Sequence, residues 1–282
     1  MGIKVTKMQG CGNDFVILDY DEFQKTNCSM DDLARKLCNR NFGIGADGLI
    51  IPYKNSDETD IAWFFYNSDG STAQMCGNGM RCFAKYVYDK GLVDKKEFTV
   101  KTLAGVITPQ VMDDGQVRVN MSKPILASEK IPFIPNNNLN YKISVKNRIF
   151  EGNAVSMGNP HFVIFIKDDE NLLELAKEYG PEIELCAEFP EKTNVEFIKI
   201  KASNSIELCV WERGCGITLA CGTGACASVV AGILNGYLDD SVEVKLLGGN
   251  VSVTWAGNSE STQKDVFLTG PAEYICEADF LI

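Results

Sequence analysis

Apolar residues recur along the chain in runs of strand length and predict a protein rich in β-structure. The runs combine β-branched and aromatic residues, which favour strands. The segments with this pattern are Lys4–Met8, Phe15–Leu18, Ile61–Tyr66, Glu97–Lys101, Phe162–Ile166, Val195–Ile200, Ile206–Trp211 and Val242–Leu246.

The pattern changes to a helical one after each of two Cys-Gly-x-Gly motifs. Helices are predicted over Gly79–Lys90 and Gly224–Asn235, and Gly91 and Gly236 supply stop signals at their C-terminal ends. The second helix is apolar on nearly all sides, so we expect it to be buried within a sheet. Asp31–Arg40 is predicted as a further helix at the surface.

Three blocks of sequence recur in the same order at nearly constant spacing. Chance similarity among glycine-rich turns is the alternative, but three collinear matches favour an internal duplication. The matched blocks are 12–17 with 158–164, 75–79 with 220–224, and 100–105 with 244–249.

The duplication predicts a first half over residues 1–119 and a second half over residues 120–272. A C-terminal strand near residues 273–282 is a candidate to complete the first half. Residues 132–140 are polar and rich in turn formers, and we expect them to connect the halves.

Composition and charge favour a small-molecule partner. The chain has 282 residues, 45% of them hydrophobic, and a net charge of −11, which argues against binding nucleic acid or anionic membrane. The longest strongly apolar run, Ala227–Leu234, is shorter than the roughly 18–20 residues of a membrane span. No apolar signal core begins the chain, so we expect a cytoplasmic protein. Gly2–Thr6 fits a loose myristoylation pattern but alternates like a first strand.

The chain contains 11 cysteines, an odd number that cannot be fully paired within one molecule. Without a secretory signal the thiols are expected to be reduced and mostly buried. No Cys-x2-Cys pair occurs, and His161 is the single histidine. We therefore expect neither a metal site nor a metal cofactor.

Cys76 and Cys221 each lie at the start of a predicted helix, where the helix dipole favours an anion and lowers a thiol pKa. The neighbouring glycines let backbone N–H groups approach a carboxylate closely. If the halves face one another, two thiols can invert a carbon centre, one removing its proton and the other returning one. Packing roles for both cysteines are the alternative, as is a single Cys nucleophile acting with His161.

The residues resemble the diaminopimelate epimerase family over almost the whole chain. The motifs that carry the resemblance are 12–15 (Gly-Asn-Asp-Phe), 41–48 (Asn-Phe-Gly-Ile-Gly-Ala-Asp-Gly), 67–71, 75–79, 157–161 (Met-Gly-Asn-Pro-His), 212–214 (Glu-Arg-Gly) and 220–225. The resemblance implies an α+β fold with two pseudo-symmetric domains, each a barrel-like mixed β-sheet around a central helix. It places the active site in the cleft between them.

The activity that the resemblance implies is a cofactor-independent conversion of LL-2,6-diaminopimelate to the meso form. This isomerase reaction feeds lysine and peptidoglycan synthesis in the cytoplasm. The implied partner is the small-molecule substrate, with no nucleic acid and no membrane. A homodimer is compatible with the resemblance, and the oligomeric state is left open.

The resemblance also assigns site residues. Cys76 and Cys221 are the catalytic thiols, assisted by His161 and Glu212. The implied substrate-binding residues are, for the reacting end, Asn13 and the backbone of Gly77, Asn78, Gly222 and Thr223, and, for the distal end, Asn67, Asn159, Asn194, Glu212 and Arg213. Turn formation by the asparagines and a surface ion pair between Glu212 and Arg213 are the structural alternatives.

Two positions depart from the family pattern: Gln9 stands where His is common, and Ile217 where Glu is common. Ile217 cannot ionise, so we expect changes in rate or pH dependence rather than loss of activity. The competing functions are a proline or hydroxyproline racemase-type isomerase of the same fold and a non-catalytic ligand-binding or thiol-redox relative. If both thiols flank one carbon, oxidation should join Cys76 to Cys221 and abolish activity.

Overall fold

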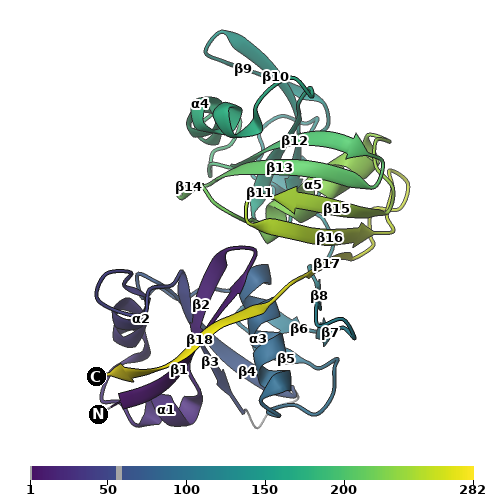
Figure 1. Ribbon diagram of the computed structural model, residues 1–282. Coiled ribbons are helices and arrows are strands. Elements are labelled where there is room, and N and C mark those ends of the chain that lie inside the picture. The colour runs from purple at the N-terminus through teal and green to yellow at the C-terminus, as the bar shows by residue number, and fades with distance from the viewer. Residues whose placement is uncertain (1, 55–58) are drawn as a thin grey trace. The chain divides into compact units, whose positions relative to one another are not determined.

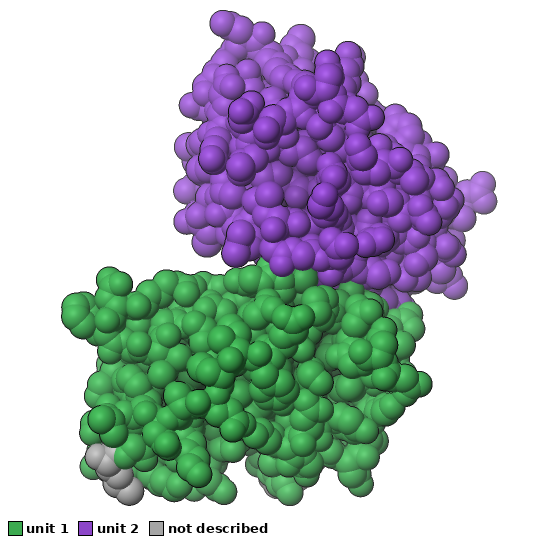
Figure 2. Space-filling view, in the orientation of Figure 1, with its two compact units in different colours: residues 1–120, 269–282 green, residues 121–268 purple. Residues whose placement is uncertain are grey.

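The computed structural model describes residues 2–54 and 59–282 (Figure 1). Residue 1, the first residue of the predicted first half, and residues 55–58 lie outside the described residues. The chain forms two compact units, residues 1–120 with 269–282 and residues 121–268 (Figure 2). None of the helices in the described part of the chain is long and apolar enough to cross a membrane.

A mixed β-sheet forms the framework of the first unit. In spatial order its strands are β18 (Glu273–Leu281), β1 (Gly2–Gly10), β2 (Asn13–Ile17), β3 (Gly48–Tyr53), β4 (Ile61–Asn67), β5 (Val100–Thr102) and β6 (Gly105–Ile107). The pairs β2–β3 and β4–β5 are parallel, and the other neighbours are antiparallel. In β1, Thr6 pairs with Ile17 on one side and with Glu277 on the other, so the last strand is joined to the first.

Helix α3 (Gly77–Asp89) is the central helix of the first unit. It packs against β1, β2 and β3 and against the hairpin of β7 (Pro109–Val111) and β8 (Val117–Asn120). Strands on several sides explain why nearly all residues from Gly77 to Val87 are buried. Two shorter helices, α1 (Tyr20–Gln24) and α2 (Met30–Cys38), lie outside this core, and α2 buries only one face.

The second unit repeats this plan with a larger mixed sheet. In spatial order its strands are β17 (Val266–Gly270), β16 (Gly249–Trp255), β15 (Ser241–Leu246), β13 (Ser205–Glu212), β12 (Asn194–Ala202), β11 (Pro160–Phe165), β10 (Arg148–Ser156) and β9 (Tyr141–Val145). The pairs β11–β12 and β13–β15 are parallel, and the short β14 (Gly216–Ile217) pairs with β13. A 3-10 turn, η1 (Ser128–Lys130), precedes β9.

Helix α5 (Gly222–Leu234) is the central helix of the second unit. It packs against β10, β11, β12 and β16 (Figure 1). Every residue from Gly224 to Gly232 is buried. The expectation drawn from its uniformly apolar sequence is confirmed. The mixed sheets, each with one buried helix, confirm the α+β class.

Helix α4 (Leu172–Glu184) was not predicted. Gly180 and Pro181 resemble a helix stop, but they lie inside the helix, which Asn171 caps by accepting from the N–H groups of Leu173 and Glu174. Gly180 is required by packing, because a Cβ there would lie 2.6 Å from Cβ of Trp211. Tertiary contact with β13 therefore outweighs the local signal.

The prediction that residues 132–140 connect the two halves is wrong, because this segment lies inside the second unit. Phe133 from this segment is buried in the core of the second unit, where its ring packs against Phe189 and Tyr141. Several helices and strands also begin or end at residues other than those predicted. The two central helices begin at Gly77 and Gly222, α2 ends at Cys38, and only Val100–Thr102 forms a strand where Glu97–Lys101 was expected.

Candidate active site

Cys76 is the N-cap residue of α3. Its backbone is extended, with φ −144° and ψ 121°, and its sulfur accepts from the N–H of Gly79 at 3.5 Å. The first-turn N–H groups of a helix have no intrahelical acceptor and favour an anion at this end. The thiol is half-buried, and Gly77 beside it carries no side chain that would cover the helix end.

Cys221 has the same position at the start of α5. Its φ and ψ are −122° and 107°, and its sulfur accepts from the N–H of Gly224 at 3.3 Å. Only 5% of the residue is exposed. The duplication is therefore visible in the geometry of both thiols, each held by the backbone N–H three residues further on.

Two of the predicted amide residues meet Cys76 in the first unit. Asn13 Oδ1 lies 3.6 Å from Cys76 Sγ and accepts from Asn78 Nδ2 at 3.1 Å. Asn67 is exposed at the end of β4, where its amide donates to Ser71 Oγ at 2.9 Å. Asn13 and Asn78 thus form one group with the thiol, whereas this side-chain contact of Asn67 lies within its own turn.

Two charged residues that sequence reasoning missed fix these amides. Asp47 Oδ2 accepts from Asn13 Nδ2 at 2.5 Å, and Arg81 Nη1 donates to Asn78 Oδ1 at 2.9 Å. Arg81 is fully buried and also donates from Nε to the carbonyl of Pro271 at 3.0 Å. The helix also contains Lys85 and Asp89, so charge alone did not single out Arg81, which differs from them by being buried.

A second chain of polar contacts leads to Cys221. The hydroxyl of Thr223 lies 3.5 Å from Cys221 Sγ and accepts from Asn159 Nδ2 at 3.3 Å. Asn159 Oδ1 lies 3.0 Å from Nε2 of His161, which is completely buried. The structure therefore brings three predicted residues to the second thiol in one line.

Glu196 is the last residue in this line of contacts from Cys221, and the sequence did not identify it as a site residue. Its Oε1 lies 2.6 Å from His161 Nδ1, and both side chains are completely buried. The sequence signal was a carboxylate inside the apolar run of β12.

The expected lowering of the thiol pKa is wrong for Cys221. Burial raises its pKa well above the ordinary value, and the nearby Glu212 and Glu196 carboxylates raise it further. Hydrogen bonds from the Thr223 hydroxyl and the Gly224 N–H act in the opposite direction but are smaller. The helix N-terminus alone therefore does not decide the charge of this thiol.

Three of the residues predicted to hold the distal end, Asn194, Glu212 and Arg213, lie at the start of β12 and at the end of β13. Asn194 is buried, donates to the Pro160 carbonyl at 2.8 Å and accepts from the Arg213 N–H at 2.9 Å. Arg213 Nη1 donates to the carbonyl of Glu191 at 2.9 Å. Asn194 thus shapes the turn that carries Arg213.

Glu212 accepts from Thr218, and the Arg213 guanidinium donates to the Glu191 carbonyl, so the surface ion pair considered for Glu212 and Arg213 is absent among the described contacts. Burial raises the pKa of Glu212, while the Thr218 hydrogen bond and His161 lower it. From α4, Glu184 accepts from the N–H of Gly214 at 3.0 Å. The unpredicted helix therefore supports the Glu-Arg-Gly turn.

Both departures from the family pattern have structural partners. Gln9 donates to Glu273 at 2.6 Å and accepts from the N–H of Gly12 at 2.7 Å, so it ties the turn before Asn13 to β18. Ile217 in β14 pairs with Trp211 and packs against the core of the second unit. A carboxylate at position 217 would face that apolar core.

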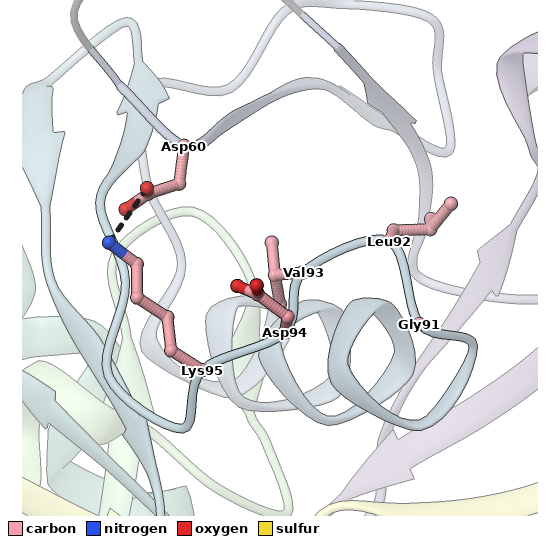
Figure 3. A pocket seen from close by; sticks show the side chains of 6 residues that line it. All are labelled: Asp60, Gly91, Leu92, Val93, Asp94 and Lys95. Carbon is pink, nitrogen blue, oxygen red and sulfur yellow. Dashed lines mark ion pairs between the residues drawn. The ribbon is translucent and has the colours of Figure 1, made fainter.

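The surface also carries a cavity of about 280 Å³ beyond the C-terminal end of α3 (Figure 3). The Lys95 Nζ–Asp60 Oδ1 ion pair, 2.8 Å long, lies on its wall. No predicted site residue lines it, and Cys76 lies at the opposite end of the helix. Within residues 2–54 and 59–282, no group of three or more His, Cys, Asp and Glu side chains is arranged to hold a metal ion.

Comparison with known proteins identifies relatives along the whole chain. A family model described as "Diaminopimelate epimerase" matches residues 5–127 and again residues 153–275, as expected for an internal duplication. The diaminopimelate epimerase of Desulfitobacterium hafniense is 46% identical over 97% of this chain and 96% of that protein. That of Carboxydothermus hydrogenoformans is 46% identical over 98% of each.

A solved structure shows the same fold at much lower sequence similarity. The hydroxyproline epimerase from Agrobacterium vitis, with bound trans-4-hydroxy-L-proline, has a TM-score of 0.69. It is 13% identical and the match covers 99% of this chain and 92% of that one. At this identity the likeness concerns the fold alone.

Proposed function

The chain belongs to the diaminopimelate epimerase family, and we propose that it converts LL-2,6-diaminopimelate to the meso isomer through the thiols of Cys76 and Cys221. It is an isomerase of the family whose role is in lysine biosynthesis. The observation that carries the mechanism is the repeated geometry of the two thiols. Each sulfur sits at the N-terminus of a buried helix and accepts a backbone N–H, from Gly79 or from Gly224.

The proposed reaction needs two acid–base groups on opposite faces of one carbon. One sulfur, as thiolate, takes the α-proton, and the C–H electron pair remains on the substrate as a carbanion conjugated with its carboxylate. The other sulfur, as thiol, gives its proton to the opposite face. The proton count is balanced, and the charge has moved from one sulfur to the other.

Helix N-termini suit the intermediate of this reaction. Backbone N–H groups of Gly77 and Asn78 on one side, and of Gly222 and Thr223 on the other, would stabilise the extra charge on the carboxylate oxygens. Asn13, next to Cys76, would orient this end of the substrate. No electron sink beyond these dipoles is invoked, so the proposed reaction is cofactor-independent.

The distal end of the substrate distinguishes this proposal from a proline-type isomerase. Diaminopimelate has a second carboxylate and a second ammonium group, whereas proline has neither. We assign the distal carboxylate to Asn67, Asn159, Asn194 and Arg213, because guanidinium and amide groups bind carboxylates well. Glu212 would face the distal ammonium, and with His161 would tune the thiols.

The proposed setting is the cytoplasm, with a dissolved amino acid as the only partner in the reaction. A net charge of −11 gives no electrostatic basis for recruiting nucleic acid or an anionic membrane. A homodimer is the assembly that we would test by light scattering.

The decisive experiment is incubation of reduced protein with LL-diaminopimelate in D2O. Stereochemistry and α-deuterium are followed together at early conversion. Two separate acid–base groups predict that the meso product carries deuterium at the inverted centre while unreacted LL substrate stays protonated.

Two other outcomes would contradict the proposal. Deuterium that enters unreacted LL substrate as fast as product forms would indicate one exchanging base. No inversion and no exchange would reject diaminopimelate as substrate, and L-proline and trans-4-hydroxy-L-proline would be assayed next under the same conditions.

A further inference from the structure

Glu196 is a completely buried carboxylate to which the proposed reaction gives no role. It projects from β12, the strand that pairs in parallel with the strand of His161. Its Oε1 contacts His161 Nδ1 at 2.6 Å, whereas its Oε2 has no hydrogen-bond partner among the described residues. Burying a carboxylate with one unpartnered oxygen costs desolvation free energy, and a buried pair such as Glu196 with His161 contributes little net stability. Its presence therefore calls for a role other than holding the fold together.

The position of Glu196 connects it to Cys221 in two ways. The first is the line of contacts through His161, Asn159 and Thr223, with separations of 2.6, 3.0, 3.3 and 3.5 Å from Glu196 to the sulfur. The second is direct proximity across Gly224. A Cβ on that glycine would lie 2.8 Å from Glu196 Oε1 and 3.2 Å from Cys221 Sγ.

Charged groups reach this thiol from three neighbouring strands. His161 comes from β11, Glu196 from β12 and Glu212 from β13, and Cys221 itself caps α5. Of the two carboxylates, Glu212 is partly exposed and bonded to Thr218, whereas Glu196 is sealed and bonded to the imidazole. Glu196 is thus the one placed to orient the ring.

We propose that Glu196 is a positioning residue for Cys221: its carboxylate accepts the hydrogen on Nδ1 of His161 and so holds Nε2 against Asn159, which fixes Thr223 beside the sulfur. A carboxylate can only accept, which places a hydrogen on Nδ1. Asn159 donates its NH2 to Thr223 and turns its oxygen to Nε2, so the contact with His161 needs a second hydrogen on Nε2. The carboxylate's charge, next to the thiol, also favours the protonated sulfur that must donate to the substrate. Only the kinetic part of this inference rests on the proposed function.

The imidazole can be read directly, because His161 is the single histidine of the chain. A protein labelled with 15N-histidine gives the NMR signals of one imidazole, and the measurement requires neither substrate nor catalytic turnover. In the wild type we expect Nδ1 to carry a hydrogen with the downfield proton shift of a short bond to a carboxylate. In Glu196→Gln that downfield resonance should be lost. Glu207→Gln, which removes a partly exposed carboxylate on β13 that pairs with Lys245, should leave it unchanged.

Thiol reactivity supplies a second readout that a purely structural role would not move. Removing the charge of Glu196 should speed alkylation of Cys221 several-fold, measured by mass spectrometry, and leave Cys76 unchanged. General loss of stability would instead expose both thiols. With diaminopimelate, kcat should fall about 10- to 100-fold, as when an outer group that orients a reacting one is removed, with KM little changed.

The proposal is overturned if wild-type Nδ1 carries no hydrogen, or if Glu196→Gln leaves both kcat and Cys221 alkylation within twofold of the wild type. Should Glu196→Gln fail to fold, Glu196→Asp keeps the charge but shortens its reach, and the wild-type spectrum alone still tests the Nδ1 hydrogen. A protein with the expected spectrum and alkylation but no epimerase activity would refute the proposed function and leave the placement of His161 standing.

Discussion

The amides of Asn13 and Asn78 are held in one orientation by charged neighbours. Arg81 can only donate, so Asn78 turns its oxygen toward it and its NH2 toward Asn13. Asp47 can only accept, so Asn13 turns its NH2 toward Asp47 and its oxygen toward Cys76. The first thiol thus faces an acceptor whose direction is set at both ends, whereas the second faces the hydroxyl of Thr223, which can donate.

Replacing Asp47 with Ala should disturb this arrangement without unfolding the protein. The exposed carboxylate contributes little to the core, but without it Asn13 can rotate and present its NH2 to Cys76. We expect kcat for diaminopimelate to fall about 10-fold, because small misplacements at a reacting group are costly. Steady-state kinetics and a thermal melt measure the two effects.

Asp113→Ala is the matched control for this change. Asp113 is exposed and forms an ion pair with Lys96, and such pairs contribute little. Its kinetics should match the wild type. Equal kcat values for Asp47→Ala and Asp113→Ala would show that the orientation of Asn13 does not matter.

At the scale of elements, the two central helices differ at the glycine that bonds each thiol. At Gly224 of α5 a Cβ would lie 2.8 Å from Glu196 Oε1 and 3.2 Å from Cys221 Sγ. At Gly79 of α3 the nearest atoms are 3.4 Å away, in the ring of Phe15. Equivalent positions of the duplicated sequence therefore have different space around them.

Gly224→Ala and Gly79→Ala should give opposite results. The first must displace Glu196 or the sulfur, and we expect kcat to fall about 100-fold. The second places alanine in a helix with room for it, and should leave kcat near the wild type and raise the free energy of unfolding by up to about 1 kcal/mol. Kinetics and guanidinium unfolding of both variants test this, and a comparable loss of activity in the two would contradict the asymmetry.

How far the sequence predicts the fold depends on whether an element carries its own signal. α5 was predictable because its residues are apolar on every side, and α3 because a glycine motif precedes it. α4 was not, because Gly180 and Pro181 resemble a stop and only contact with Trp211 explains the glycine. The connection at residues 132–140 failed for the same reason, since Phe133 is buried by partners distant in sequence.

The site residues also fall into those that the sequence predicted and those that it did not. Cys76 and Cys221 were predictable because the duplication repeats their motif at the same point of each half. Glu196 and Arg81 were not, because each lies in an element with other charged residues, and only burial and partners in space distinguish it from them. The pKa of Cys221 also depends on carboxylates from other strands, which no local rule includes.

The contact between α4 and β13 can be tested by adding one methyl group. Gly180→Ala places a Cβ 2.6 Å from Cβ of Trp211, and this overpacking should lower the free energy of unfolding by about 1–3 kcal/mol. Glu178→Ala, at an exposed position of the same helix, is the control and should change little. If both variants unfold at the same guanidinium concentration, the close packing of α4 on Trp211 is not present in solution.

At the scale of the whole molecule, buried thiols couple stability to alkaline pH. Burial raises the pKa of Cys38 and of Cys82 to about 12, from an ordinary value of 9.0. Burial also raises the pKa of Cys221 in the second unit. In the unfolded chain these thiols ionise near their ordinary value, so above pH 9 the unfolded state binds fewer protons than the native state.

Stability should therefore fall as pH rises from 9 to 10.5. Each such thiol contributes a slope of up to about 1.4 kcal/mol per pH unit once its unfolded form is ionised, and the contribution is absent below that range. Guanidinium unfolding at several pH values measures the slope in the presence of a reductant. The double variant Cys38→Ser/Cys82→Ser removes two of these groups, because a serine hydroxyl does not ionise here, and its dependence on pH should be flatter whatever its absolute stability. Parallel slopes for the variant and the wild type would mean that these thiols are not sealed from water in the native protein.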